Sequence, residues 1–110
     1  MTEEDPVYLV LCTVPEDAAR DLVDHLLEER RIACANLLGP VESRYRWQGE
    51  LEVSQEILLL MKARASTLAG LRDRIAGLHP YEVPEVLEFR ADSGLPAYLA
   101  WVAASCSPDS

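Results

Sequence analysis

The chain has 110 residues, of which 49% are hydrophobic, so it can form one domain with a single core. Nineteen acidic residues against ten basic ones give a formal net charge of -9. This charge repels the phosphate backbone of nucleic acids and anionic lipid surfaces, so neither is expected as a partner. We predict one domain over residues 1–110, with ends that fray at residues 1–6 and 107–110.

The N-terminus and the cysteines indicate a cytoplasmic protein. Residues 1–5 are polar and acidic, and no apolar run reaches the roughly 18 residues that a membrane span needs. Cys12, Cys34 and Cys106 are odd in number and widely spaced, which favours neither a disulfide framework nor a closed zinc site. We therefore expect reduced thiols.

The first predicted elements are a strand and a helix. The run VYLVLC over residues 7–12 is apolar without alternation, as in a strand covered on both faces. Pro15 is suited to the first turn of a helix, and the apolar stripe that follows predicts a helix to about Arg30. His25 lies off that stripe among acidic residues, so it is interpreted as a solvated side chain outside any site.

A long hairpin follows, with residues 32–47 and 50–62 as its arms and Gln48-Gly49 as its turn. Gly39-Pro40 interrupts the first arm and predicts a bulge or bend. An arm of this length spans roughly 45 Å at about 3.3 Å per residue, whereas a domain of this size is only about 35 Å across. The hairpin should project and pair with another copy of the chain, because unpaired apolar strands aggregate.

The remaining elements complete a recognisable order. Ser66 and Thr67 predict the cap of a second helix that ends at His79, and residues 83–89 and 95–105 predict an edge strand and a short closing helix. The order β-α-β-β-α-β is the split βαβ, ferredoxin-like pattern of an α+β fold with an antiparallel sheet. Both main helices then cover one face of the sheet, and the other face needs a cover.

Several segments carry a family resemblance. They read VYLVLCTVP, RRIACANLLGPVESRYRWQGELE, EILLLMK, and HPYEVPEVL followed by YLAWV. In this order and spacing the chain resembles the CutA family of divalent-cation tolerance proteins over about residues 7–102. The resemblance implies a ferredoxin-like homotrimer whose long hairpins pair between subunits. It also implies a response to copper and other divalent metal ions, and an architecture similar to the trimeric PII-type signalling proteins.

Candidate metal ligands follow from donor chemistry and from the resemblance. Copper, particularly Cu(I), favours thiolate donors, and imidazole suits Cu(II) and zinc, which makes Cys12 and His79 the first candidates. In the family, the corresponding cysteine and histidine are associated with copper binding. Glu85 can supply an oxygen donor or orient His79. A small buried core residue is an equally good interpretation of Cys12.

Two departures from the family pattern bear on this prediction. Some relatives have a second histidine immediately before the His-Pro pair, where this chain has Leu78, so a metal site here can have one donor fewer. The Lys-Thr pair common after the third strand is Lys62-Ala63 here, which removes a hydroxyl.

Aromatic residues define a candidate cleft between subunits. Tyr81 lies between two prolines, and ligand binding and packing at a subunit boundary are equally good interpretations of it. Tyr45 and Trp47 alternate along the hairpin and so share one face, where packing between subunits is favoured over ligand stacking. Glu50, Glu52 and Glu56 also share a face, which we interpret as solvated.

The sequence favours a binding protein over an enzyme, since it contains none of the motifs of nucleophilic, phosphate-binding or paired-ligand metal catalysis. The first hypothesis is a trimeric divalent-cation tolerance protein that binds copper. The alternative is a PII-like sensor or adaptor that binds a small metabolite or a partner protein at clefts between subunits. No particular protein partner is predicted.

Overall fold

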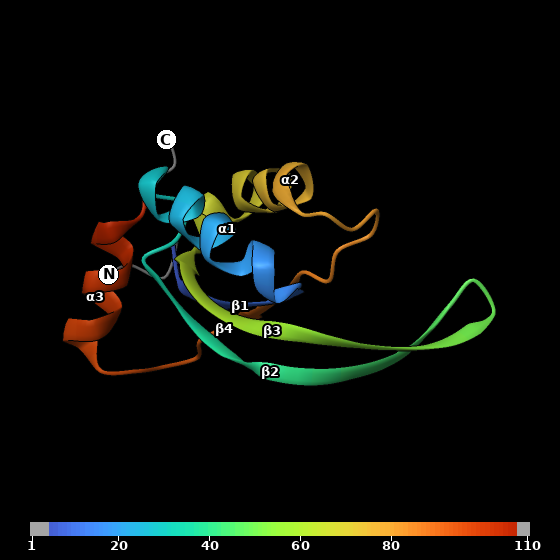
Figure 1. Ribbon diagram of the computed structural model, residues 1–110. Helices are drawn as coiled ribbons and strands as arrows, with labels where there is room; N and C mark the ends of the chain where they lie inside the picture. The colour runs from blue at the N-terminus through green and yellow to red at the C-terminus, as the bar shows by residue number, and fades with distance from the viewer. Residues whose placement is uncertain (1–4, 108–110) are drawn as a thin grey trace.

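A four-stranded antiparallel sheet lies at the centre of the computed structural model, which describes residues 5–107 (Figure 1). The elements in chain order are β1 (Val7–Val14), α1 (Glu16–Glu28), β2 (Cys34–Trp47), β3 (Glu50–Arg64), a 3₁₀ turn (Ala65–Thr67), α2 (Leu68–Leu78), β4 (Leu87–Arg90) and α3 (Pro96–Ser105). The strand order is β2-β3-β1-β4, with α1 and α2 on one face. The predicted α+β, ferredoxin-like fold is confirmed.

The core lies between the sheet and the helices α1 and α2. Alternate residues of β1, among them Val10 and Val14, are fully buried against Leu26 of α1 and Ile75 of α2. Full burial of each such aliphatic side chain contributes about 1.5–3 kcal/mol. The uninterrupted apolar run of β1 therefore follows from its position in mid-sheet, between β3 and β4.

Helix α1 ends at Glu28, two residues before the predicted end, because Arg30 has a left-handed backbone with φ of 57°. The next amide, of Arg31, then donates to the carbonyl of Leu26 at 2.9 Å. Such a reversal closes the last carbonyls of a helix and turns the chain back toward the sheet.

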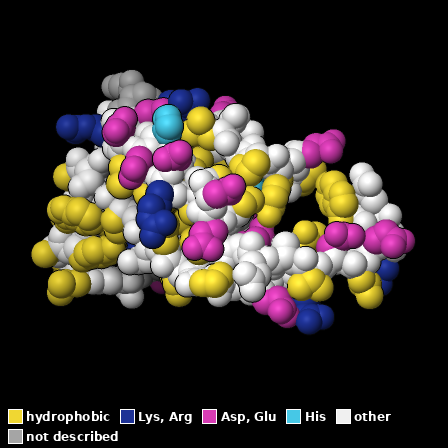
Figure 2. Space-filling view, viewed as in Figure 1, with side chains coloured by type: hydrophobic (Ala, Val, Ile, Leu, Met, Phe, Trp, Pro, Cys, Tyr) yellow, Lys and Arg dark blue, Asp and Glu magenta, His cyan; other side chains and the backbone are white. Residues whose placement is uncertain are grey.

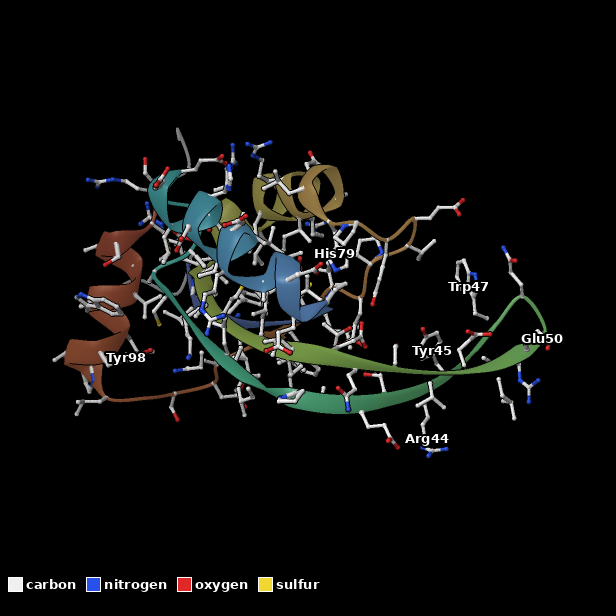
Figure 3. All side chains as sticks on the ribbon, in the orientation of Figure 1. Arg44, Tyr45, Trp47, Glu50, His79 and Tyr98 are labelled. Atoms are coloured by element: carbon white, nitrogen blue, oxygen red, sulfur yellow. The ribbon has the colours of Figure 1, made fainter. Side chains whose placement is uncertain are left out.

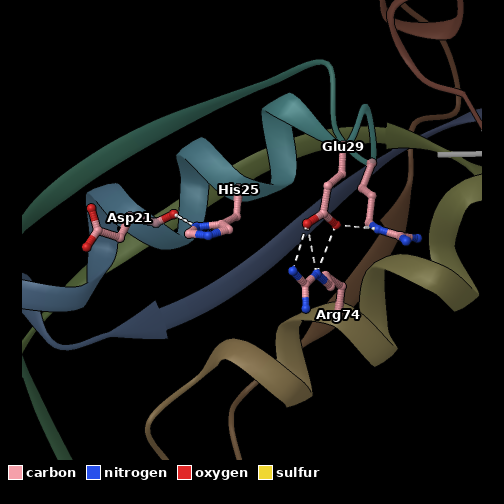
Figure 4. A network of polar contacts seen from close by, with 5 residues as sticks. Asp21, His25, Glu29 and Arg74 are labelled. Carbon is pink, nitrogen blue, oxygen red and sulfur yellow. Dashed lines mark hydrogen bonds and ion pairs between the residues drawn. The ribbon is translucent and has the colours of Figure 1, made fainter.

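An ion-pair network joins the end of α1 to α2 (Figure 4). The Glu29 carboxylate accepts from Arg74 Nε at 2.9 Å and from Arg31 Nε at 2.9 Å. Hydrogen bonds from Arg74 and then Arg31 lower the pKa of Glu29 to about 2. His25 lies on the exposed face of α1, where Nδ1 is 2.7 Å from the Asp21 carbonyl, outside the candidate site as predicted.

The hairpin has the predicted turn and the predicted irregularity. Gln48 and Gly49 both have positive φ, of 50° and 83°, as a tight two-residue turn requires. The register between β2 and β3 shifts between Leu38 and Val41. Gly39 within that bulge has φ of 143°, and a side chain there would come within 3.0 Å of the Glu56 carbonyl.

The hairpin projects beyond the body of the molecule. Strand β1 ends where Val14 pairs with Ile57, so in the described part of the chain the outer parts of β2 and β3 pair only with each other. The molecule measures 45 × 26 × 22 Å, and its long axis follows the hairpin (Figure 1). The predicted projection is confirmed.

One predicted boundary and one predicted helix cap are corrected. Strand β4 starts at Leu87 instead of residue 83, because Pro84 has no amide for a ladder and residues 79–86 form an irregular segment. Ser66 and Thr67 do not cap α2 with their side chains. Instead the Asp5 carboxylate accepts from the amide and the hydroxyl of Ser66, at 2.8 and 2.9 Å.

Backbone hydrogen bonds attach the described residues near both ends of the chain to the rest of the molecule. The Pro6 carbonyl accepts from the Ala65 amide at 2.9 Å, and the Ser107 amide donates to the Arg30 carbonyl at 3.0 Å. Residues 1–4 and 108–110 of the ranges expected to fray lie outside the described residues.

Apolar side chains remain uncovered on α3 and β4. Tyr98 and Trp101 on α3 are 41% and 48% exposed, and Leu87 and Phe89 on β4 are each 50% exposed. Figure 2 shows hydrophobic side chains gathered over the end of the molecule that α3 occupies in Figure 1. No helix within residues 5–107 is long and apolar enough to cross a membrane.

Candidate functional site

A cleft of about 660 Å³ opens where β1 ends, between the projecting hairpin and the segment of residues 79–86. Figure 2 shows the molecule hollowed between the hairpin and the body. Its lining residues are Thr13, Ser43, Arg44, Tyr45, Trp47, Glu52, Glu56, Pro80, Tyr81, Glu82, Val83 and Glu85. Aromatic rings and carboxylates thus face one another across it.

The register of the hairpin builds one wall. Tyr45 is paired with Glu52, and the same face continues to Trp47 in one direction and to Glu56 in the other. Figure 3 shows Tyr45 and Trp47 on the side of the hairpin that faces residues 79–86, and Arg44 on the opposite side. Arg44 Nε bonds there to a neighbouring carboxylate at 2.7 Å. The positive charge of this wall therefore points away from the cleft.

Glu56 is the innermost carboxylate of the cleft. Its side chain is 4% exposed, and it accepts a hydrogen bond from the Tyr81 hydroxyl at 2.7 Å. Burial and the bond to Glu56 raise the pKa of Tyr81 to about 12, so the phenol stays a donor. Nearby, the Tyr45 hydroxyl lies 3.1 Å from Ser54 Oγ.

The acidic side chains of the cleft have no basic partner within the described part of the chain. Ion pairs there join five pairs of groups, and none includes a cleft carboxylate. Glutamates 52, 56, 82 and 85 all line the same cavity. Because a buried carboxylate is stable only when paired or well hydrogen-bonded, the cleft is suited to a positively charged ligand.

His79 holds the segment opposite the hairpin in place. Its Nε2 lies 2.8 Å from the Thr13 carbonyl, and its Nδ1 accepts from the Tyr81 amide at 3.1 Å. These partners assign the neutral tautomer with the proton on Nε2. The His79 and Tyr81 rings also pack with centroids 4.8 Å apart. His79 therefore orients Tyr81 toward Glu56.

Cys12 lies in the core beside the cleft. It is fully buried, and its thiol donates weakly to the Thr13 carbonyl at 3.6 Å. Burial, with the carboxylates of Glu85 and then Glu56, raises the pKa of Cys12 to about 12. The thiol is therefore protonated at neutral pH, as in a small buried core residue.

The predicted site residues separate into two groups. Tyr45, Trp47, Tyr81 and Glu85 line the cleft together, whereas Cys12 and His79 both bond to the Thr13 carbonyl. Between residues 5 and 107, no three His, Cys, Asp or Glu side chains are placed to hold one metal ion. The ligand set Cys12, His79 and Glu85 stays a prediction.

Sequence reasoning missed the two acidic residues of the hairpin wall. Glu52 and Glu56 were assigned to a solvated face, yet both line the cleft, and Glu56 is buried. The signal was available in the hairpin register, which puts them on the same face as Tyr45 and Trp47. The sequence did not show that residues 79–86 cover that face.

Comparison with known proteins agrees with this fold over nearly the whole chain. The model of the family described as CutA1 divalent ion tolerance protein matches residues 8–105. A divalent-cation tolerance protein CutA from Thermus thermophilus is 43% identical over 95 residues, which cover 86% of this chain and 92% of that protein.

Solved structures of related proteins also match nearly the whole chain. The structure of a divalent cation tolerance protein from Thermus thermophilus matches with a TM-score of 0.89 and 40% identity, over 92% of this chain and 99% of that one. A PII-like protein CutA from Nostoc sp. PCC 7120 matches with a TM-score of 0.87 and 33% identity, over 91% and 97%. On both sequence and structure, the chain belongs to the CutA1 divalent ion tolerance family.

Proposed function

We propose that this chain is a cytoplasmic, homotrimeric divalent-cation tolerance protein that binds cations in the cleft and is not an enzyme. The main support is Glu56, a buried carboxylate at the base of an acidic cavity, which has a phenol partner but no ion pair within residues 5–107. The family to which the chain belongs supports divalent cations as ligands.

Copper is the proposed metal, with Glu85 in the cleft lining and Cys12 and His79 beside the cleft as ligands. The chemistry of this donor set is suitable, since copper takes thiolate and imidazole donors. Binding requires two changes, because the Cys12 thiol must lose its proton and one nitrogen of His79 must release its present partner. Copper binding should therefore strengthen as pH rises.

Calorimetric titration with copper tests this ligand set. We expect the affinity to fall at least tenfold in Cys12→Ser, His79→Gln and Glu85→Gln. Cys34→Ser is the matched control, because Cys34 lies on β2 away from the cleft lining and should bind copper as the unsubstituted chain does. Unchanged affinity in all three ligand variants would remove the proposed metal site.

A PII-like sensor is the second candidate, and the size of the cleft favours it. A volume of about 660 Å³ falls in the range of roughly 300–1,000 Å³ that small-molecule pockets occupy. The relative from Nostoc is named PII-like. Thermal-shift screening separates the two candidates, since a metabolite that raises the melting temperature while copper has no effect supports the sensor.

A further inference from the structure

The two carboxylates of the hairpin wall are separated along the cleft. Glu52 and Glu56 both lie on β3, four residues apart, so their Cα atoms are about 13 Å apart at about 3.3 Å per residue. Glu82 and Glu85 line the opposite side, on the segment that leads into β4. A ligand that pairs with both Glu52 and Glu56 must therefore be elongated and must have more than one positive charge.

Aromatic rings line the same cleft as these carboxylates, with Tyr45 paired opposite Glu52. Tyr45 and Trp47 extend from the hairpin toward the cleft (Figure 3), and Tyr81 closes it from the other side with its hydroxyl on Glu56. Ammonium groups bind favourably over aromatic faces within about 6 Å of the ring centre, and alkyl chains pack against the same faces. A cleft with both features is suited to ammonium groups joined by aliphatic spacers.

The buried carboxylate is the independent observation that points to such a ligand. Glu56 is 4% exposed and opens onto the cleft, and the only side-chain donor that the described residues place on it is the Tyr81 hydroxyl. A buried charge ordinarily has an oppositely charged partner. Arg44 is the basic residue among those that line the cleft, and its guanidinium lies on the other side of the hairpin, where it pairs with Glu42.

We propose that the cleft binds an elongated aliphatic polyamine, with one ammonium group on Glu56, another near Glu52 or Glu85, and the alkyl chain against Tyr45 and Trp47. This inference rests on the cation-binding cleft of the proposed function and specifies the class of its ligand. The volume of about 660 Å³ accommodates a ligand of this kind.

Calorimetric titration of the assembled protein with spermidine tests the proposal. Butylamine, with a single ammonium group, and Mg²⁺, with compact charge, are the matched ligands. We expect saturable spermidine binding, at least tenfold weaker binding of both matched ligands, and weaker spermidine binding as NaCl increases. Absence of saturable spermidine binding, or equal binding of butylamine, would overturn the proposal.

Variants locate the binding. Glu56→Gln keeps an acceptor for the Tyr81 hydroxyl and should fold, yet it should weaken spermidine binding at least fivefold. Trp47→Leu should weaken it at least threefold. Glu42→Gln, on the opposite face of the same hairpin, is the matched control and should bind spermidine as the unsubstituted chain does. An equal loss in Glu42→Gln and Glu56→Gln would contradict binding in the cleft.

The two proposals can fail separately. If copper binds and its affinity depends on Cys12, His79 and Glu85 while spermidine does not bind, the metal function stands and the polyamine proposal is wrong. If spermidine binds with the expected dependence on Glu56 while copper does not bind, the polyamine proposal stands and the metal function is wrong. Circular dichroism and melting temperature establish that each variant is folded before it is titrated.

Discussion

Tyr81 and Glu56 share the hydrogen bond that closes the cleft, at 2.7 Å between the phenol and the carboxylate. Tyr81→Phe removes the donor and leaves the buried Glu56 carboxylate without it. We expect the free energy of unfolding to fall by roughly 1–3 kcal/mol, the usual effect of losing one partner of a buried polar group. Urea denaturation at pH 7 measures this change.

Tyr45→Phe is the matched control for that measurement. The Tyr45 side chain is 42% exposed, and its hydroxyl lies 3.1 Å from Ser54 Oγ, a bond that water can replace. We expect a smaller loss than in Tyr81→Phe. If both substitutions lower the free energy of unfolding equally, the bond from Tyr81 to Glu56 does not stabilise the fold more than an exposed bond does.

The Cys12 thiol makes stability depend on pH in the alkaline range. Its pKa is raised from 9.0 to about 12 by burial and by the nearby carboxylates, first Glu85 and then Glu56. A raised folded-state pKa contributes stability that is present below pH 9 and is lost as pH rises toward 12, since the thiol ionises first in the unfolded chain.

Urea denaturation at pH 8 and pH 10.5 measures this contribution. The unsubstituted chain should lose more stability between these two pH values than Cys12→Ala does. The other titrating groups are common to both proteins, so the difference in slope isolates Cys12. If stability falls equally with pH in both proteins, the fold does not raise the pKa of the Cys12 thiol.

At the scale of elements, the ion pairs of Glu29 with Arg31 and Arg74 connect the end of α1 to α2. Hydrogen bonds from Arg74 and then Arg31 lower the pKa of Glu29 from 4.5 to about 2. A depressed folded-state pKa contributes stability above about pH 4.5, which is lost as pH falls toward 2. We expect Glu29→Gln to lower the urea midpoint at pH 7 by a modest amount, because these side chains are partly exposed.

The acid dependence distinguishes this network from a packing effect. The difference between Glu29→Gln and the unsubstituted chain should narrow as pH falls from 4.5 toward 2. Glu28→Gln, on an exposed neighbouring residue without an ion pair among the described residues, is the control and should leave the midpoint nearly unchanged. A difference that stays constant with pH would contradict the ionic origin.

The regular elements could be predicted because local signals and packing agree in them. The apolar run over residues 7–12 predicts a strand, and Gln48-Gly49 predicts a tight turn. The structure has both. The segment of residues 79–86 could not be predicted in the same way. Its path is set by long-range bonds from His79 to Thr13 and from Tyr81 to Glu56, which no local pattern shows.

The candidate site was therefore predictable in part. The sequence predicts Tyr45, Trp47 and Tyr81 for a cleft between subunits and Glu85 for a metal site, and the structure places all four in the lining of one cleft. Burial of Glu56 depends on a neighbour distant in sequence, so alternation along the strand alone indicated a solvated residue. Hairpin register together with the position of Tyr81 is the information that was needed.

At the scale of the whole molecule, uncovered apolar surface supports the proposed trimer. Phe89 on β4 and Trp101 on α3 are 50% and 48% exposed, and among residues 5–107 the projecting parts of β2 and β3 pair only with each other. Sedimentation should give three times the chain mass of 12.3 kDa. Burial of such surface commonly drives closed symmetric assembly.

Substitutions test which surface holds the assembly together. Trp101→Asp should shift the sedimenting species toward a single chain, because it places a charge in the apolar patch. Leu27→Asp is the control, on a residue of α1 that is 39% exposed on the helix-covered side, and should leave the mass unchanged. A lone subunit in the unsubstituted protein would contradict the trimer.

The acidic and aromatic cleft is proposed as the functional site, with a positively charged ligand. Magnetic-resonance titration of ¹⁵N-labelled protein with spermidine and, separately, with Zn²⁺ tests it most directly. We predict the largest shifts at the Trp47 indole N–H and the Tyr81 amide for at least one of the two cations. Shifts confined to α3, or none with either cation, would contradict the claim.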